Sequence, residues 1–203
     1  MCYINNMQPK TLLFIGRSGA GKGTQSKKVM EYLESEKTGL IVYYLETGAH
    51  FREFVKGESY TSSRSKVIYD KAERQPDFLA VWNWADLLVR YFRDSMHLIM
   101  DGMPRSLSEA HILRTALDFY GIKNLQVVHV NVSPEWSRDR LNERHRLDDK
   151  SPEEIEKKIA WFDTDVLPAI EYFKQDPFYS FIEVNGEQAI DDVYNEIFSK
   201  LKW

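Results

Sequence analysis

The stretch GRSGAGKGTQ, residues 16–25, could bind the phosphate groups of a nucleotide. Gly16 and Gly21-Lys22 have the spacing G-x-x-x-x-G-K, in which glycines let successive backbone N–H groups turn inward around an anion. A helix that begins at this point adds positive potential, and Lys22 supplies a mobile cation for the β- and γ-phosphates. The Ser or Thr that usually follows the lysine is replaced by Gly23. The pattern predicts a nucleotide-binding loop made of Gly19, Ala20, Gly21, Lys22, Gly23 and Thr24.

A second group of residues that could hold phosphate lies in the stretch RLNERHRLDDK. It contains Arg140, Arg144, Arg146, Asp148 and Asp149. A guanidinium group matches two phosphate oxygens at once, so clustered arginines favour a polyanion as the ligand. Arg140 and Arg144 are four residues apart and share one face of an expected helix. The two aspartates can orient the arginines while the site is empty. We interpret the stretch as a clamp for an anion rather than a solvated run of charges.

Short apolar runs alternate with helix-like stretches along the chain. The runs occupy residues 11–15, 40–45, 97–101, 125–132 and 178–184. Several are apolar on both faces, which is typical of parallel strands covered on both sides. Helices are expected at 22–36, at 78–92, after Ser133-Pro134, after Ser151-Pro152 and at about 188–202. The alternation predicts an α/β fold with a doubly wound, five-stranded parallel sheet flanked by helices. Residues 46–76 fit this sheet poorly and are expected to form short helices.

The composition is that of one globular domain. The chain has 203 residues, of which 43% are hydrophobic and 29% charged, enough for one substantial core. The formal net charge of −4 argues against a nucleic-acid partner. Cys2 is the only cysteine, which excludes an intramolecular disulfide and argues against a cysteine metal site. The sequence shows no signal-peptide pattern and no apolar run of membrane-spanning length. We expect a cytoplasmic protein without a membrane partner.

Six motifs occur in the order that is typical of adenylate kinases. They are GKGTQ, ETGAHFR (46–52), QPD (75–77), DGMPR (101–105), the arginine–aspartate stretch and VNGE (184–187). The chain therefore resembles the adenylate kinases, and more broadly the nucleoside monophosphate kinases, over residues from about 11 to 195. The resemblance implies a P-loop NTPase-type fold and a reversible transfer of the γ-phosphoryl group of Mg-ATP to a nucleoside monophosphate.

The resemblance also implies that one domain, residues 1–203, is divided into a core and two mobile parts. The expected parts are a core of residues 1–45, 79–143 and 150–203, a monophosphate-binding segment at 46–78 and a short lid at 144–149. Related kinases have a loop or a small domain where only His145 stands here, between Arg144 and Arg146. We expect phosphate binding to survive and water exclusion to be poorer, with measurable ATP hydrolysis in the absence of acceptor. A monomer is expected because the mobile parts need free surface.

Roles for individual residues follow from the resemblance. The catalytic residues would be Lys22, Arg105, Arg140, Arg144, Arg146 and Lys158. ATP would contact the phosphate loop together with Arg140, Arg144 and Gln188. The acceptor would contact Thr47, Arg52, Gln75, Gly102, Arg105, Glu109, Arg146 and Lys158. Asp101 would hold Mg²⁺ through water. These residue types suit phosphoryl transfer, which needs positioned charge more than covalent chemistry.

Glu109 stands where adenylate kinases usually carry a Gln that reads the adenine edge. A Gln amide both donates and accepts hydrogen bonds, which matches N1 and the N6 amino group of adenine. An ionised Glu only accepts, and guanine suits it better because guanine presents N–H donors at N1 and N2. Glu109 also completes a capping box with Ser106, so capping alone is an alternative role.

Three other positions depart from the family pattern. Ala49 replaces an Asp in the acceptor segment, Lys158 replaces an arginine, and Gln188 lies near the position of a glycine beside the ATP adenine. A lysine keeps the charge of an arginine but loses its bidentate contact. Thr47-Gly48 resembles adenylate kinases more than the pyrimidine kinases, so AMP is the preferred acceptor. The alternatives are another monophosphate, GMP first and then CMP, UMP or dTMP, and a non-catalytic nucleotide-binding module.

Overall fold

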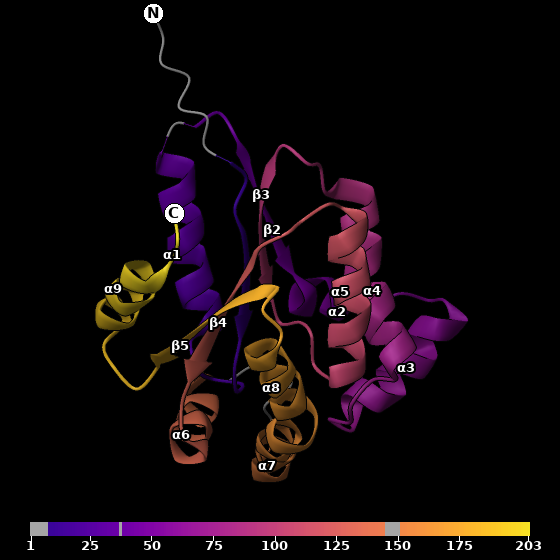
Figure 1. The fold of residues 1–203 in the computed structure, drawn as a ribbon. Helices are drawn as coiled ribbons and strands as arrows, with labels where there is room; N and C mark the ends of the chain where they lie inside the picture. The colour runs from indigo at the N-terminus through magenta and orange to yellow at the C-terminus, as the bar shows by residue number, and fades with distance from the viewer. Residues whose placement is uncertain (1–7, 37, 145–150) are drawn as a thin grey trace, which may run out of the picture.

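The fold is built around a five-stranded parallel sheet (Figure 1). The computed structural model describes residues 8–36, 38–144 and 151–203. The strands are β1 (Thr11–Ile15), β2 (Ile41–Glu46), β3 (Met96–Asp101), β4 (Leu125–Asn131) and β5 (Tyr179–Asn185). Their order in space is β2-β3-β1-β4-β5, and every neighbouring pair is parallel. The predicted α/β class is confirmed, and each strand begins and ends within one residue of its predicted position.

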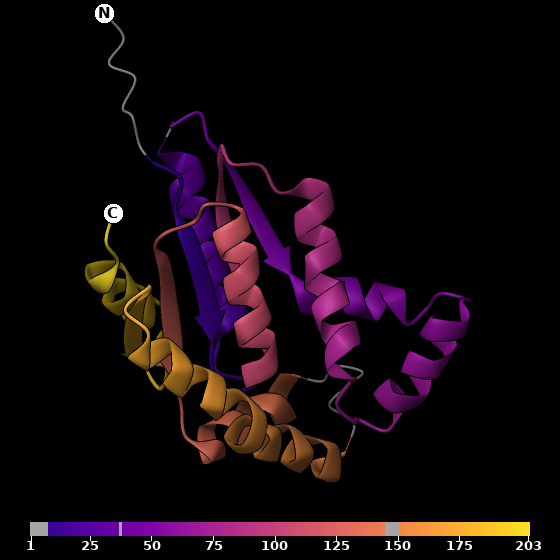
Figure 2. The same ribbon diagram turned by 45° about the vertical axis from the view of Figure 1, so that its right-hand side comes forward.

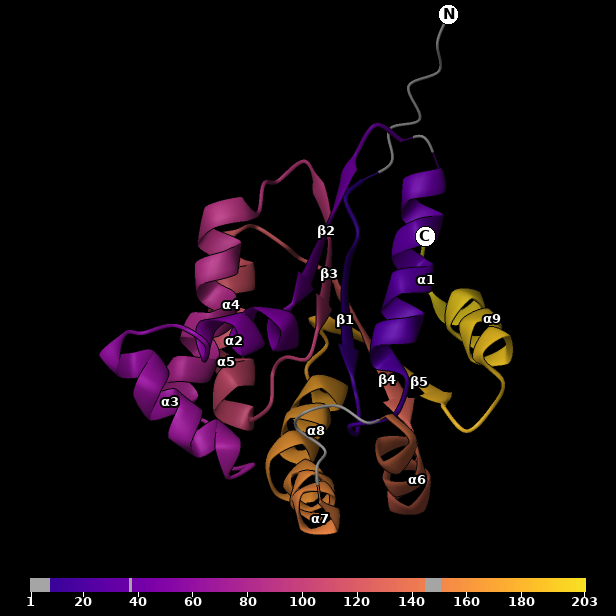
Figure 3. The same cartoon turned by 180° about the vertical axis from the view of Figure 1, so that it is seen from behind.

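Helices cover both faces of the sheet (Figures 1 and 3). They are α1 (Lys22–Ser35), α2 (Thr47–Phe54), α3 (Tyr60–Asp70), α4 (Asp77–Tyr91), α5 (Leu107–Phe119), α6 (Pro134–Arg144), α7 (Pro152–Trp161), α8 (Leu167–Gln175) and α9 (Ile190–Lys200). A π-helical turn, η1 (Phe162–Val166), joins α7 to α8. Helices α1 and α9 pack on one face of the sheet, and α4, α5 and α8 pack on the other. This arrangement confirms the predicted doubly wound fold.

Strand β1 shows why apolar and polar residues do not alternate along the apolar runs. Leu12 and Phe14 belong to a buried cluster that includes Val29 of α1, whereas Leu13 and Ile15 belong to the cluster on the opposite face. Successive side chains of a strand point to opposite faces, so a strand covered on both sides must be apolar at every position. The central strand is therefore fully buried, and its carboxyl end is held rigidly where the phosphate loop begins.

The segment between β2 and α4 leaves the sheet and forms α2 and α3, as predicted for short helices. Figure 2 shows α3 projecting from the body of the molecule at the side of α4. Helix α2 is tied back to α4 by Asn83, whose Nδ2 donates to the backbone oxygen of Thr47 at 2.9 Å. Thr47 is thereby fixed at the root of the projecting segment.

Helix α6 ends at Arg144 and α7 begins at Pro152. Leu141 of α6 packs against Ile155 and Ile159 of α7, so the two helices are in direct contact. Arg146, Asp148 and Asp149 lie outside the described residues, as does the side chain of Arg144, and the predicted clamp stays a prediction at these positions. Among the described helices, none is long and apolar enough to cross a bilayer.

Candidate active site

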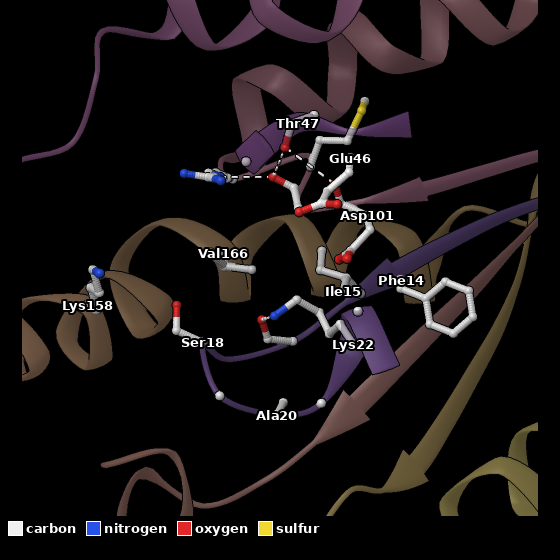
Figure 4. Close-up of a pocket in the computed structure, with 18 of the residues that line it drawn as sticks. Phe14, Ile15, Ser18, Ala20, Lys22, Glu46, Thr47, Asp101, Lys158 and Val166 are labelled. Atoms are coloured by element: carbon white, nitrogen blue, oxygen red, sulfur yellow. Dashed lines mark hydrogen bonds between the residues drawn. The ribbon is translucent and has the colours of Figure 1, made fainter. Parts of the chain in front are cut away.

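Three adjacent strands end at one edge of the sheet. Strands β2, β3 and β1 are neighbours, with Glu46 in register with Asp101 and Phe14 in register with Asp101 on the other side. Because the strands are parallel, their carboxyl ends bring together the loop after β1, the segment after β2 and the end of β3. A cleft of about 1060 Å³ opens at this edge (Figure 4). Its volume is at or above the upper end for a single drug-sized ligand, so it has room for two nucleotides.

The loop after β1 curls because of its glycines. Gly19 and Gly21 have positive φ angles of 83° and 86°, a region that favours glycine. A Cβ atom at Gly19 would also lie 3.0 Å from the backbone oxygen of Ser137. The Ser137 hydroxyl donates to the backbone oxygen of Ser18 at 2.6 Å and fastens the loop to α6. The predicted Gly-rich loop therefore has the backbone shape that its sequence pattern implies.

Lys22 is the first residue of α1 and lies inside the curve of the loop (Figure 4). Its Nζ donates to the backbone oxygens of Gly16 at 2.9 Å and Arg17 at 2.7 Å. The ammonium group is therefore already positioned at the start of a helix, where backbone N–H groups also point toward a bound anion. Arg140 lies beside the loop as well, because its Cβ is 3.3 Å from the position that a Cβ on Gly19 would take.

Asp101 ends β3 and is 8% exposed. Its Oδ2 accepts a hydrogen bond from the hydroxyl of Tyr44 at 3.0 Å. A Cβ on Gly23 would lie 3.2 Å from the same oxygen, so the missing side chain at position 23 lets the carboxylate approach the first turn of α1. Burial and the charge of Asp101 raise the pKa of Tyr44 above its ordinary value. A tyrosine hydroxyl is already protonated at neutral pH, so it can donate to the carboxylate there.

The opposite wall of the cleft is formed by α2 and by the connection from β3 to α5. Thr47 Oγ1 donates to the backbone oxygen of Gly102 at 2.9 Å, and Nε of Arg105 donates to the same oxygen at 2.9 Å. Arg52 lies one helical turn beyond Thr47 and pairs with Glu46, at 3.4 Å between NH2 and Oε1. Two arginines thus stand on the wall facing the phosphate loop.

Three further predicted residues line the cleft, and the side-chain amides of two of them are already hydrogen-bonded. The side-chain amide of Gln75 accepts from the Ser65 hydroxyl at 2.9 Å and donates to the backbone oxygen of Ser65 at 3.1 Å, which braces α3. Nε2 of Gln188 donates to the backbone oxygen of Asn185 at 2.8 Å. Lys158 enters the cleft from α7 (Figure 4). Every predicted site residue whose side chain is described lines the cleft.

Glu109 is the third residue of α5, and its backbone N–H donates to the Ser106 hydroxyl at 3.2 Å. The predicted cap at Ser106 is therefore confirmed. The carboxyl group is buried, with the residue only 1% exposed, and Oε1 has no hydrogen-bond partner among the residues that the structure describes. Burial is the largest cause of a raised pKa for this carboxyl group, opposed by the charge of Arg105. Glu109 is thus capped by Ser106 through its backbone, while its carboxyl group keeps an unsatisfied oxygen at the cleft.

Sequence reasoning missed two arginines that tie the site to η1. Arg17, in the phosphate loop, forms an ion pair with Asp163 at 2.7 Å and lies over the ring of Phe162. Arg74, at the end of the acceptor segment, pairs with Asp165 at 2.7 Å and lines the cleft. Neither pairing leaves a signal in the sequence, because the partners are far apart along the chain.

Comparison with known proteins places these features in a family. The family model described as adenylate kinase matches residues 14–177. An adenylate kinase of Bacteroides fragilis is 29% identical over 193 residues, which cover 92% of this chain and 95% of the relative. Adenylate kinase 1 of Nostoc sp. is 27% identical over 186 residues, which cover 92% of this chain and 95% of the relative. An adenylate kinase of Lachnospira eligens is 26% identical over 219 residues, covering 92% of this chain and 97% of the relative.

Proposed function

The chain belongs to the adenylate kinase family, and we propose that it transfers the γ-phosphoryl group of Mg-ATP reversibly to AMP. As a member of this family it is a phosphotransferase with a phosphate group as acceptor. The observation that carries the proposal is a single cleft in which the loop around Lys22 faces a wall containing Arg52 and Arg105. Transfer between two polyanions requires both to be held in line within one site.

The donor side would be formed by the phosphate loop. Backbone N–H groups of residues 19–24 would surround the β-phosphate, and Lys22 would follow the γ-phosphoryl group as charge develops on it. Arg140 would approach from α6, with Arg144 and Arg146 completing the clamp, and Gln188 would lie near the donor base. Lys158 would contact the transferring group from α7. Because the phosphate of the acceptor is itself the nucleophile, no covalent enzyme intermediate is required.

The end of β3 fits a magnesium ion held through water. A Mg²⁺ ion in a nucleotide site is bound by one or two carboxylates together with waters and substrate phosphates. Asp101 supplies one such carboxylate beside the first turn of α1, and the described residues contain no cluster of three acidic or imidazole ligands that would make a full protein cage. A magnesium ion held there would supply positive charge that neutralises part of the charge of the donor phosphates. Asp101 and Tyr44 would orient its water ligands.

The acceptor side would be formed by residues on the opposite wall. Arg52 and Arg105 would bind the α-phosphate of AMP, since guanidinium groups match phosphate oxygens bidentately. Thr47 and Gly102 hold the connection between β3 and α5 close to α2, which fixes the two arginines relative to each other. Gln75 would brace the segment from α3. Glu109 would lie at the acceptor base, one helical turn beyond Arg105.

The experiment that tests this function is a coupled assay of diphosphate production with Mg-ATP and each of AMP, GMP, CMP, UMP and dTMP. We expect kcat/KM to be highest for AMP. A strong preference for another base would overturn the choice of acceptor and leave the phosphotransferase class intact. GMP is the second candidate, because an ionised Glu109 would accept hydrogen bonds from its N1 and N2 groups. Tight ATP binding with no transfer to any of the five would instead favour a non-catalytic nucleotide-binding module.

A further inference from the structure

The carboxyl group of Glu109 is a buried polar group whose hydrogen bonding is incomplete. The residue is 1% exposed, and its side chain lines the same cleft as Arg105 and Trp84. Within residues 8–36, 38–144 and 151–203, Oε1 has no hydrogen-bond partner. Burying a carboxylate whose hydrogen bonding is incomplete is costly, and the usual response of such a group is to hold its proton more tightly. Burial therefore shifts the protonation equilibrium of this carboxyl group toward the neutral acid.

The charges around Glu109 do not reverse this preference. Arg105, on the connection before α5, lowers the pKa of the carboxyl through its charge and through a backbone hydrogen bond. Arg74 lowers it from the acceptor segment, and Asp77 at the start of α4 raises it. Arg74 is itself paired with both Asp77 and Asp165 of η1, which reduces its net effect. Burial outweighs these opposing charges, and the pKa of Glu109 is raised.

A protonated carboxyl group offers one donor and one acceptor side by side, which is the pattern of a carboxamide. Adenine presents the complementary pair, an acceptor at N1 and a donor at the N6 amino group. We propose that Glu109 reads the acceptor base as a neutral carboxylic acid, donating its O–H to N1 of adenine and accepting from N6. This inference rests on the proposed function, because it places the acceptor base beside the first turn of α5.

The ionised form would select a different base. A carboxylate has two acceptors, which match the N1 and N2 donors of guanine and meet the N1 lone pair of adenine unfavourably. Loss of the proton from Glu109 should therefore weaken the binding of AMP and strengthen the binding of GMP. The affinity for AMP relative to that for GMP would therefore report whether the carboxyl group of Glu109 is protonated.

Equilibrium binding of AMP and of GMP tests the inference without requiring turnover. Dissociation constants are measured for the wild type, for Glu109→Gln and for Glu109→Leu by titration calorimetry, from about pH 5.5 to 8.5. The phosphate of both ligands has its own pKa near 6, so affinities also change with pH for that reason. Glu109→Gln experiences the same phosphate titration but keeps a fixed donor and acceptor. The ratio of wild-type to Glu109→Gln affinity therefore isolates the carboxyl group.

At the acid end, we expect the wild type and Glu109→Gln to bind AMP equally within about threefold, and Glu109→Leu to bind at least about tenfold more weakly. As the pH rises past the pKa of Glu109 in the complex, wild-type AMP affinity should fall relative to Glu109→Gln, and the GMP to AMP ratio should rise. Melting curves identify a variant that does not fold, in which case Glu109→Ala replaces Glu109→Leu.

Two results at the acid end would overturn the inference. If Glu109→Leu binds AMP as well as the wild type, the carboxyl group does not contact the base. If the wild type binds AMP much more weakly than Glu109→Gln and prefers GMP, the group reads the base as a carboxylate. Failure of phosphoryl transfer in the acceptor assay would refute the proposed function separately, because the binding measurements do not depend on it.

Discussion

The hydroxyl of Tyr44 on β2 donates a hydrogen bond to Oδ2 of Asp101 at the end of β3, over 3.0 Å. This contact joins two adjacent strands at the place where the phosphate loop begins, and Ser26 of α1 lies 3.1 Å from the same hydroxyl. The Tyr44 hydroxyl is protonated at neutral pH, and burial and the charge of Asp101 raise its pKa further. The relationship fixes which way Asp101 faces before any metal or nucleotide arrives.

Removing the Tyr44 hydroxyl should lower the affinity of the site for Mg²⁺. Groups that orient a metal ligand typically contribute about 10-fold or more to metal affinity. We expect Tyr44→Phe to raise the Mg²⁺ concentration for half-maximal activity by about tenfold and to leave KM for AMP nearly unchanged. Magnesium titrations of initial rate measure both. An unchanged magnesium requirement would show that Asp101 needs no orienting partner. Tyr43→Phe is a matched control, because that hydroxyl donates to the backbone oxygen of Leu87 and lies outside the cleft.

Replacing Arg105 by lysine should weaken the binding of the acceptor AMP and leave the binding of the donor ATP nearly unchanged. Lysine keeps the positive charge but loses the planar fork that binds two phosphate oxygens. We expect Arg105→Lys to raise KM for AMP by about 10- to 100-fold with little change in KM for ATP. Initial rates at varied concentrations of each substrate separate the two effects. Arg90→Lys is the control, since Arg90 is exposed on α4, where it pairs with Asp86 of the same helix. Equal losses for both substrates would contradict an acceptor role.

Restoring an arginine at position 158 should raise the rate. The side chain of Lys158 lines the cleft from α7, and a guanidinium there could contact two oxygens of the transferring group. We expect Lys158→Arg to increase kcat about two- to tenfold, by gaining one hydrogen bond in the transition state. Steady-state kinetics with saturating substrates give the comparison. A slower enzyme would count against placing Lys158 at the transferring phosphate.

The free energy of unfolding should change with pH because the carboxyl group of Glu109 titrates differently in the folded and the unfolded chain. At a pH below about 4.5, the carboxyl is protonated in both the folded and the unfolded chain. As the pH rises above that value, the unfolded chain releases the proton and the folded chain keeps it, because the folded pKa is raised. The free energy of unfolding then falls by about 1.4 kcal/mol per pH unit until the folded pKa is reached.

Glutamine does not titrate, so Glu109→Gln should lack this loss of stability. We expect the melting temperature of the variant minus that of the wild type to increase between about pH 4.5 and pH 7. Thermal unfolding followed by circular dichroism at several pH values measures the difference. A difference that stays constant across this range would show that the carboxyl titrates equally in the folded and unfolded chains.

The sequence alone predicted the elements that depend on local pattern. Strands covered on both faces are continuously apolar, so the five runs were recognisable, and the spacing of Gly16, Gly21 and Lys22 located the phosphate loop. Helix ends were less accurate, because they depend on contacts made in the folded chain. Helix α9 begins at Ile190 rather than near 188, since Gln188 uses its side-chain amide to bond Asn185 and Glu196.

The contacts made by distant residues could not be predicted from one sequence. The pairs Arg17–Asp163 and Arg74–Asp165 join positions separated by 146 and 91 residues, and charged residues carry no periodic signal of their partners. The burial of Glu109 was also hidden, because a Glu in the first turn of a helix usually remains in solvent. The close approach of Asp101 to Gly23 gives a physical reason for the glycine at that position, which the sequence showed only as a departure.

Transfer of label from γ-phosphate-labelled ATP tests the central claim most directly. With AMP and Mg²⁺ present, the label should appear in ADP, and Lys22→Met should lower the rate by about 100- to 1000-fold. Lys56→Met is the control, because Lys56 is exposed and forms a surface ion pair with Glu53. Label that stays in ATP, or that appears only as inorganic phosphate whether or not AMP is present, would contradict phosphoryl transfer to AMP in this cleft.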